Sequence, residues 1–208
     1  DLCLNSELSS EITLQPIKRF NLDSAIIFSD ILMVPFALGQ KVEFIKNKGP
    51  ILSNFNLEIF LDNDKELFSK KLNPVYKAIE ITRSKLDKKK SLISFIGAPW
   101  TLLIYMFGVK TNKNEINYEK IRSRETELQI TLNKLTEYLC RHIENQINAG
   151  ADVVQIFDSW AGLLSKEDLR NYCYIPNLKI VEFCKKKIYQ LSVFQKDLRK
   201  TTKSLIKL

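Results

Sequence analysis

The segment Gly150-Ala-Asp-Val-Val-Gln-Ile-Phe-Asp-Ser-Trp-Ala-Gly162 decides the fold of this chain. Residues 152–157 form a short apolar run typical of a buried strand, and the run ends abruptly in the polar pair Asp158-Ser159. A long helix is predicted just before it, from about Arg124 to Asn148, because leucine and isoleucine recur there every three or four residues. A helix that leads into a buried strand is typical of a parallel sheet.

Two earlier apolar runs, Ser24–Phe28 and Leu92–Ile96, repeat the pattern and also stop in polar or turn residues. A further helix is predicted from Lys166 to about Lys187, with Ser165 as its N-cap, and Asn73-Pro74 is predicted to open a helix between the first two strands. This alternation fits an open doubly wound sheet or a (β/α)8 barrel. In both folds the chemistry lies at the C-terminal ends of the strands.

Composition limits the class of protein. The 208 residues are 45% hydrophobic, enough for one core, and no apolar run reaches the roughly 18 residues of a membrane span, so we expect no membrane partner. The four cysteines, Cys3, Cys140, Cys173 and Cys184, lack disulfide-framework or zinc-site spacing, which favours a cytoplasmic location. Because the sequence begins at Asp1 without methionine, we expect the true N-terminus to lie upstream.

The net charge of +8 is concentrated in one place. Residues 185–208 hold seven lysines and one arginine against one aspartate, a surplus of +7, which leaves +1 for the rest of the chain. A nearly neutral body argues against a nucleic-acid partner, since phosphate recognition needs cations organised on a face. The competing interpretation, a basic binding module, depends on this tail alone and predicts that truncation at Lys187 abolishes any nucleic-acid affinity.

Cofactor motifs are missing from the strand ends. No G-x-G-x-x-G or G-x-x-x-x-G-K-[ST] follows any predicted strand, and the only histidine, His142, excludes a multi-histidine metal site. His142 lies beside the apolar stripe of the long helix, so we interpret it as a partly exposed packing residue. We therefore expect no cofactor.

Several residues near the strand ends allow two interpretations. Asp30 follows the first strand and either caps a helix or acts as a partly desolvated charge stabiliser, and Asp158 and Ser159 raise the same choice. Tyr105 either presents a phenol to a substrate or belongs to the core. Trp100 and Trp160 either wall a pocket or cover the sheet. Spacing alone does not decide between these alternatives.

Three segments in this order, residues 20–32, 97–106 and 150–162, closely resemble the uroporphyrinogen decarboxylase family. The motifs Phe28-Ser-Asp30, Gly97-Ala-Pro-Trp-Thr101 and Asp158-Ser-Trp-Ala-Gly162 carry the resemblance, which extends from near Asp1 to about Lys187. It implies an α/β fold, a partial (β/α)8 TIM barrel with about three to four of the eight strands. It also implies a cofactor-free, homodimeric lyase of tetrapyrrole synthesis that converts uroporphyrinogen to coproporphyrinogen with release of four CO2.

By the same resemblance, Asp30 is the catalytic aspartate that accepts hydrogen bonds from the pyrrole N–H groups at the centre of the substrate. Tyr105 and Ser159 match two further substrate-binding positions. A fixed carboxylate suits the reaction because it stabilises the cation formed when a pyrrole carbon is protonated. The resemblance therefore favours a catalytic role for Asp30 over capping.

The chain also departs from the family. The arginine-containing R-Q-A-G-R motif and a C-terminal substrate-contacting histidine are absent, so we expect a fragment that is inactive and only marginally folded by itself. We divide the chain into residues 1–187, the partial barrel domain, and residues 188–208, a basic tail foreign to the family. After Lys187 the family continues roughly Ile-Pro-Thr-Ile-Cys-Phe-Pro-Lys-Gly, and one nucleotide string can encode both this and the observed tail in different frames.

The alternative enzyme class, the zinc-dependent corrinoid methyltransferases, needs a His/Cys zinc site, and the chain contains no H-x-C.

Overall fold

The computed structural model describes residues 2–46, 49–109, 115–187 and 189–195. Its main sheet has four parallel strands in the order β1-β4-β5-β6, and a separate antiparallel hairpin joins β2 to β3. The strands are β1 (Ser24–Ile26), β2 (Val42–Ile45), β3 (Gly49–Leu52), β4 (Ser91–Gly97), β5 (Val153–Asp158) and β6 (Gln190–Gln195). The helical elements are η1 (Leu2–Leu4), α1 (Ser6–Phe20), α2 (Met33–Ala37), α3 (Leu57–Asp62), α4 (Lys65–Lys71), α5 (Asn73–Lys85), α6 (Pro99–Met106), α7 (Tyr118–Arg122), α8 (Glu125–Asn148), η2 (Ala161–Leu163), α9 (Lys166–Asp168), the π-helical η3 (Leu169–Tyr174) and α10 (Ile175–Lys187).

The three predicted strands and the long predicted helix are confirmed. The first strand is shorter than predicted and ends at Ile26, although the Ile27 amide still donates to the carbonyl of Ile93 (2.9 Å). Helix α5 begins at Asn73, as the Asn-Pro pair predicts, because proline fits the first turn of a helix.

The helix predicted from Lys166 to Lys187 is divided in three. Ser165 does cap its start, where the hydroxyl accepts the Asp168 amide (3.2 Å). A π-helical stretch then separates α9 from α10, and Pro176 lies in the first turn of α10. Proline has no N–H to donate to the turn before it, so the regular α-helical ladder cannot continue through this point.

The fourth strand, β6, lies beyond Lys187, in the segment predicted to be a tail outside the domain. It pairs in parallel with β5, with Val153 opposite Gln190 and Phe157 opposite Phe194. The regular sheet therefore continues at least to Gln195. The origin of this tail sequence in a shifted reading frame stays a prediction.

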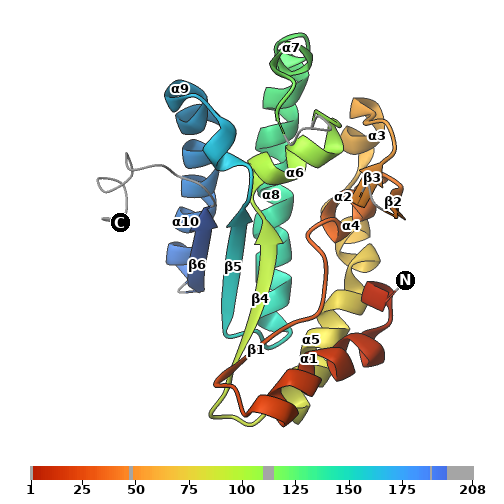
Figure 1. Ribbon diagram of the computed structural model, residues 1–208, viewed down its shortest axis with the longest axis vertical. Helices are drawn as coiled ribbons and strands as arrows, with labels where there is room; N and C mark the ends of the chain where they lie inside the picture. The colour runs from red at the N-terminus through yellow and green to blue at the C-terminus, as the bar shows by residue number, and fades with distance from the viewer. Residues whose placement is uncertain (1, 47–48, 110–114, 188, 196–208) are drawn as a thin grey trace.

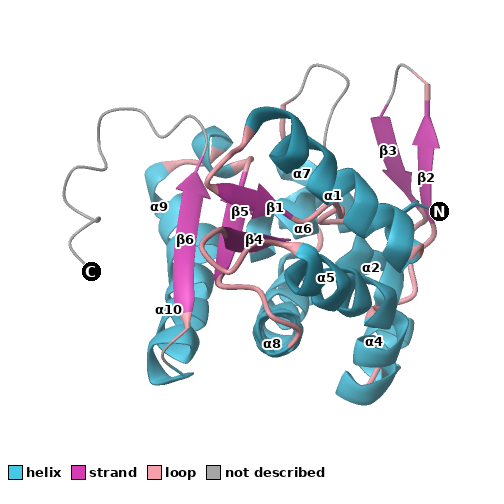
Figure 2. Ribbon diagram, turned by 90° about the horizontal axis from the view of Figure 1, so that it is seen from below, coloured by secondary structure: helices cyan, strands magenta, loops and turns pink. Residues whose placement is uncertain are grey.

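Helices cover one face of the sheet. Figures 1 and 2 show α8 and α10 on the same side of β4, β5 and β6. The side chains that alternate toward these helices, Leu92, Val154 and Ile156, are completely buried. This row and the apolar stripe of α8 form the central part of a core that extends to the other helices.

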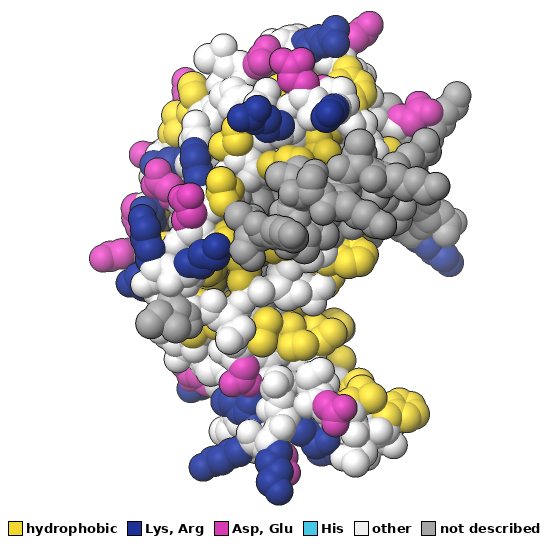
Figure 3. Space-filling model, turned by 90° about the vertical axis from the view of Figure 1, so that its left-hand side faces the viewer, with side chains coloured by type: hydrophobic (Ala, Val, Ile, Leu, Met, Phe, Trp, Pro, Cys, Tyr) yellow, Lys and Arg dark blue, Asp and Glu magenta, His cyan; other side chains and the backbone are white. Residues whose placement is uncertain are grey.

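The other face of the sheet is open. Ile26 on β1 and Phe194 on β6 are 55% and 48% exposed, and the rings of Phe95, Phe157 and Phe194 form a row across three strands. Figure 3 shows the molecule hollowed on this side, with hydrophobic side chains around the hollow. A groove of about 640 Å³ also follows β1, on the side of α1. Parallel strands, helices on one face and an open opposite face form a partial (β/α)8 barrel, as predicted.

Candidate active site

Asp30 lies in the turn between β1 and α2 and is half-buried. Its Oδ1 accepts the backbone amide of Leu32 (2.8 Å), so the carboxylate does stabilise this turn, as the capping interpretation predicts. Within the described ranges, no residue donates a hydrogen bond to Oδ2. Burial raises the pKa of Asp30 above its ordinary value, and the hydrogen bond from Leu32 opposes that shift. The turn therefore uses one carboxylate oxygen and leaves the second for another donor.

Gly97 brings the Asp30 turn close to the end of β4. A Cβ at this position would lie 3.2 Å from Cβ of Ile31 and 2.8 Å from Cδ2 of Leu102 on α6. Only glycine permits this approach without a shift of its neighbours. The residue after Asp30 thus packs against the start of the β4–α6 connection, which sets Asp30 next to the segment that carries Tyr105.

Tyr105 and Ser159 lie on neighbouring elements. Tyr105 is half-buried on α6, and its ring meets the Trp160 ring edge to face, with 6.3 Å between centroids. Ser159 is exposed in the turn that follows β5, directly before Trp160. Asp30, Tyr105 and Ser159 therefore follow three adjacent strands, β1, β4 and β5, on the same edge of the sheet. No direct contact joins Asp30 to the other two in the part of the chain that the structure describes.

The two tryptophans have different roles. Trp100 is completely buried, stacks on Tyr172 (5.2 Å between centroids) and lines a cavity of about 120 Å³ bounded by α7 and α8. Its indole Nε1 donates to the backbone carbonyl of Trp160 (3.3 Å). Trp100 thus belongs to the scaffold, whereas the Trp160 ring contacts Tyr105.

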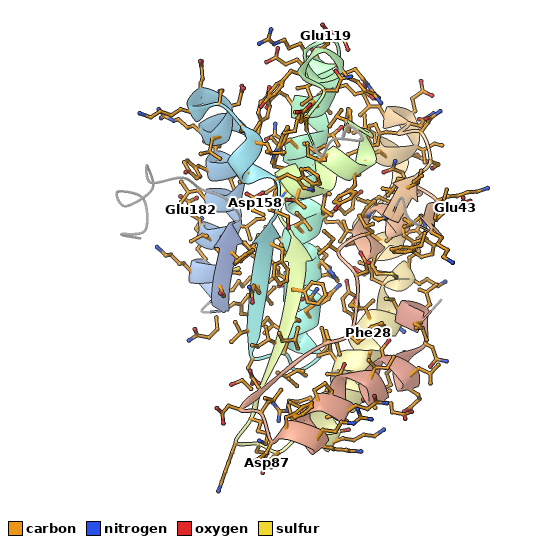
Figure 4. All side chains as sticks on the ribbon, viewed as in Figure 1. Phe28, Glu43, Asp87, Glu119, Asp158 and Glu182 are labelled. Carbon is orange, nitrogen blue, oxygen red and sulfur yellow. The ribbon has the colours of Figure 1, made fainter. Side chains whose placement is uncertain are left out.

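Asp158 is a completely buried carboxylate at the end of β5. Its Oδ1 accepts from Oγ1 of Thr101 and its Oδ2 from Nδ2 of Asn177, both at 3.1 Å. Figure 4 shows Asp158 at the upper end of β5. The sequence singles out Asp158 but not Thr101 or Asn177, because partners 57 and 19 residues away leave no local pattern.

His142 is buried, not partly exposed as predicted. Its Nδ1 is 2.9 Å from the Tyr76 hydroxyl and its Nε2 is 2.7 Å from Nε2 of Gln146. Burial lowers the pKa of His142 to about 3. A neutral imidazole with both ring nitrogens engaged is a core residue, so the packing interpretation holds and the predicted exposure is wrong.

A metal-binding cluster and a membrane-spanning helix are both absent from the described residues. No group of three or more histidine, cysteine, aspartate or glutamate side chains there is placed to hold a metal ion. No helix in those ranges is long and apolar enough to cross a membrane. The polar groups gathered at the strand ends are a carboxylate, a phenol and a hydroxyl, which can bind and stabilise a cationic or hydrogen-bonding ligand.

One solved structure shows the same fold. A methyltransferase from Methanosarcina mazei superposes with a TM-score of 0.73 at 18% sequence identity and covers 92% of this chain and 57% of its own. At this identity the likeness concerns the fold alone. It agrees with a partial barrel, because the chain matches little more than half of that structure.

Sequence comparison identifies the family. The family described as Uroporphyrinogen decarboxylase (URO-D) matches residues 1–205. The uroporphyrinogen decarboxylase of Orientia tsutsugamushi (strain Ikeda) is 43% identical over 93% of this chain and 56% of its own length. The enzyme of Campylobacter jejuni subsp. jejuni serotype O:23/36 (strain 81-176) is 42% identical over 92% and 57%. The chain thus spans about half the length of the curated relatives it matches, and it belongs to the uroporphyrinogen decarboxylase family.

Proposed function

We propose that this chain is part of a uroporphyrinogen decarboxylase, a cofactor-free lyase that removes the four acetate carboxyl groups of uroporphyrinogen to give coproporphyrinogen. The observation that carries the proposal is the half-buried Asp30 carboxylate, with Oδ2 available, beside the segment that holds Tyr105. Family membership supplies the reaction, and the position of Asp30 supplies a group suited to it.

The reaction needs an electron sink. Protonation of a pyrrole carbon gives a cation, and cleavage of the bond between the acetate CH2 and its carboxylate sends two electrons into that cation as CO2 leaves. A second proton adds to the exocyclic CH2 and the first is lost from the ring, so each acetate gains one proton and becomes a methyl group. Asp30 accepts hydrogen bonds from the pyrrole N–H groups and stabilises the cation, an effect strengthened where the anion is partly removed from water.

Tyr105 and Ser159 complete the proposed contacts. The Tyr105 hydroxyl and the exposed Ser159 hydroxyl can hydrogen-bond to the carboxylate side chains of the substrate. In this proposal the tetrapyrrole lies over the C-terminal ends of β1, β4 and β5, on the open side of the sheet. We extend the proposal to a homodimer and a cytoplasmic location, and the four cysteines are free thiols as a reducing compartment requires.

The test uses a completed protein, in which residues 1–187 of this chain replace the matching segment of the Orientia tsutsugamushi relative. Anaerobic incubation with uroporphyrinogen should give coproporphyrinogen, while the 208-residue chain alone should give none. A folded completed protein that forms no product would contradict the proposal. Its sedimentation velocity tests the homodimer.

The end of the domain is a separate proposal. We place the native family sequence before residue 188 and propose that a shifted reading frame gave the tail. The coding DNA around codon 187 tests this directly, because removal or insertion of one or two bases should there restore a sequence close to Ile-Pro-Thr-Ile-Cys-Phe-Pro-Lys-Gly. If no such frame exists, the tail is native and the domain extends through β6.

The zinc-dependent methyltransferase alternative is less well supported. Family membership points to the decarboxylases, and the likeness to the Methanosarcina mazei methyltransferase concerns the fold alone. No observation of this chain's own residues favours methyl transfer.

A further inference from the structure

The contacts of Asp158 reach two separate helices. Thr101 on α6 and Asn177 on α10 each donate a hydrogen bond to one of its oxygens. The thiol of Cys173 lies near it on the π-helical stretch, and burial, followed by the charge of Asp158, raises the pKa of Cys173. A carboxylate taken out of water is costly unless hydrogen bonds compensate, so these contacts hold Asp158 in one place.

The contact between Asp158 and Thr101 lies one helical turn before Tyr105 on α6. Thr101 precedes Tyr105 by four residues on α6, so the two side chains lie on the same face of the helix. The hydrogen bond from Thr101 to Asp158 therefore fixes both the rotation and the height of the helix face that presents the phenol.

Asp158 is also the residue before Ser159. Two further contacts cross the junction between residues 158–160 and α6. Trp100 Nε1 donates to the Trp160 carbonyl, and the Tyr105 and Trp160 rings meet edge to face. Residues 158–160 are thus bound to α6 at three points.

We propose that Asp158 is a positioning residue that holds Ser159 and Tyr105 in a fixed relation, so that both hydroxyls reach one substrate molecule. The proposal rests on the proposed function, in which these two residues contact the tetrapyrrole. Asp158 itself is completely buried on the helix side of β5, away from the open face on which we propose that the substrate binds.

The first experiment compares Thr101→Val with Thr131→Val in the 208-residue chain. Both threonines are completely buried, but the hydroxyl of Thr131 bonds only within α8, to the carbonyl of Glu127 (2.8 Å). The chain has two tryptophans, Trp100 and Trp160, and both lie at the junction. Thr101→Val should change the near-ultraviolet circular dichroism of the tryptophans, whereas Thr131→Val and the conservative Thr101→Ser should leave it unchanged.

The second experiment measures kcat and KM for the same variants in the completed protein. Because displacements of about 1 Å can cost up to roughly 100-fold, Thr101→Val should lower kcat/KM about 10- to 100-fold, mainly through KM. Thr101→Ser should restore it. Equal urea midpoints for Thr101→Val and Thr131→Val will show that lost stability is not the cause.

Asp158→Asn separates position from charge and is expected to fold. Its amide oxygen can still accept a hydrogen bond from Thr101. Its new NH2 group can donate to Oδ1 of Asn177, which has no hydrogen-bond partner among the described residues, once the Asn177 amide has rotated. The values of kcat and KM should therefore stay within about threefold of those of the wild type, well inside the spread of hydrogen-bond effects. The circular dichroism of the tryptophans should not change. A large loss of kcat with an unchanged spectrum would overturn the positioning role and point to the charge.

Other outcomes are equally decisive. If Thr101→Val matches Thr131→Val in both spectrum and kinetics, Asp158 does not position the site. If the spectrum changes but kcat/KM does not, Ser159 and Tyr105 do not act together on the substrate. If wild-type completed protein neither binds nor converts the tetrapyrrole, the proposed function fails, and the spectra still decide whether Asp158 fixes the junction.

Discussion

Strand β5 has an aspartate at each end, and the two are held very differently. Asp152 precedes the strand, and its Oδ2 accepts from Nη1 of Arg83 (2.9 Å) and from the Leu92 amide (2.7 Å). Arg83 also donates to the carbonyls of Leu86, Asp87 and Lys90. Figure 4 shows Asp87 at the bottom of the molecule, well below Asp158, which lies at the upper end of β5. The N-terminal end of the sheet is thus closed by one arginine whose charge is matched.

The C-terminal end combines a buried carboxylate that is fully engaged with a half-buried one that is only partly hydrogen-bonded. Asp158 accepts hydrogen bonds from Thr101 and Asn177, which are neutral donors, whereas Oδ1 of Asp30 accepts one backbone amide. No salt bridge forms to Asp30 in the described part of the chain. The difference indicates that the N-terminal end maintains the fold, whereas the C-terminal end keeps hydrogen-bonding capacity for a ligand, as in other barrels of this type.

The largest expected effect separates Asp30 from Asp152. In the completed protein, Asp30→Asn should lower kcat by roughly 10² to 10³, because it removes the charge that stabilises the protonated pyrrole. Asp152→Asn should change kcat less than about twofold, since it lies at the other end of the sheet. Product formation under anaerobic conditions measures both. Similar losses for the two variants, after correction for folded fraction, would end the distinction between the two ends of the sheet.

Replacement of Arg83 should have the opposite effect, a loss of stability without a loss of substrate affinity. Replacing Arg83 with alanine removes the donors to Asp152 and to three carbonyls and should lower the free energy of unfolding by roughly 2 to 3 kcal/mol. Substrate affinity of the completed protein should not change. Urea unfolding measures the first quantity and porphyrin titration the second. Lys77→Ala on the same helix is the control, because its pair with Glu80 is exposed and should not affect the midpoint.

The burial of His142 predicts that stability depends on pH, independently of the two ends of the sheet. Burial lowers its folded-state pKa from 6.5 to about 3, so between these values the unfolded chain binds a proton that the folded chain does not. Stability is therefore full above about pH 6.5 and falls as the pH decreases, by roughly 2 kcal/mol between pH 7 and 5. Urea midpoints across this range test it, and His142→Gln should flatten the curve. A histidine ring signal that titrates near pH 6.5 in the folded chain would contradict the buried imidazole.

The smallest expected effect is a gain of stability at Asp30. Because burial raises its folded-state pKa, the charged form is disfavoured by folding, and this penalty is present above the folded pKa and absent below about 3.8. Asp30→Asn should thus raise the thermal midpoint at pH 7 and match wild type at pH 3. Asp152→Asn should lower the midpoint at pH 7. A loss of stability at pH 7 in Asp30→Asn would return Asp30 to a purely capping role.

Local sequence patterns predict some elements well and others poorly. The continuous apolar runs of β4 and β5 and the leucine stripe of α8 are visible because their periodicity depends only on neighbouring residues. Strand β6 and the β2–β3 hairpin were not predicted. Gln190–Gln195 lies in the segment that we assigned to a tail foreign to the family, and Pro50 interrupts the apolar residues of β3. These segments become strands through their pairing partners, which the local pattern does not contain.

The candidate site shows the same limit. The family resemblance selects Asp30, Tyr105 and Ser159, and their roles stay predictions. The buried state of His142 depends on Tyr76, 66 residues away, and the anchoring of Asp158 depends on Thr101, 57 residues away. Contacts over such distances in the chain leave no periodic signal, so the positioning groups emerge only from the structure.

The most direct measurement of the central claim is hydrogen exchange by mass spectrometry on the completed protein, with and without uroporphyrin, the oxidised form of the substrate. Bound porphyrin should slow exchange in residues 28–32, 99–106 and 158–162, at the C-terminal ends of β1, β4 and β5. Residues 83–92 and 149–153, around Arg83 and Asp152, should exchange at the same rate in both samples. Protection confined to the Arg83 end, or none at the three strand ends despite saturating porphyrin, would contradict the account.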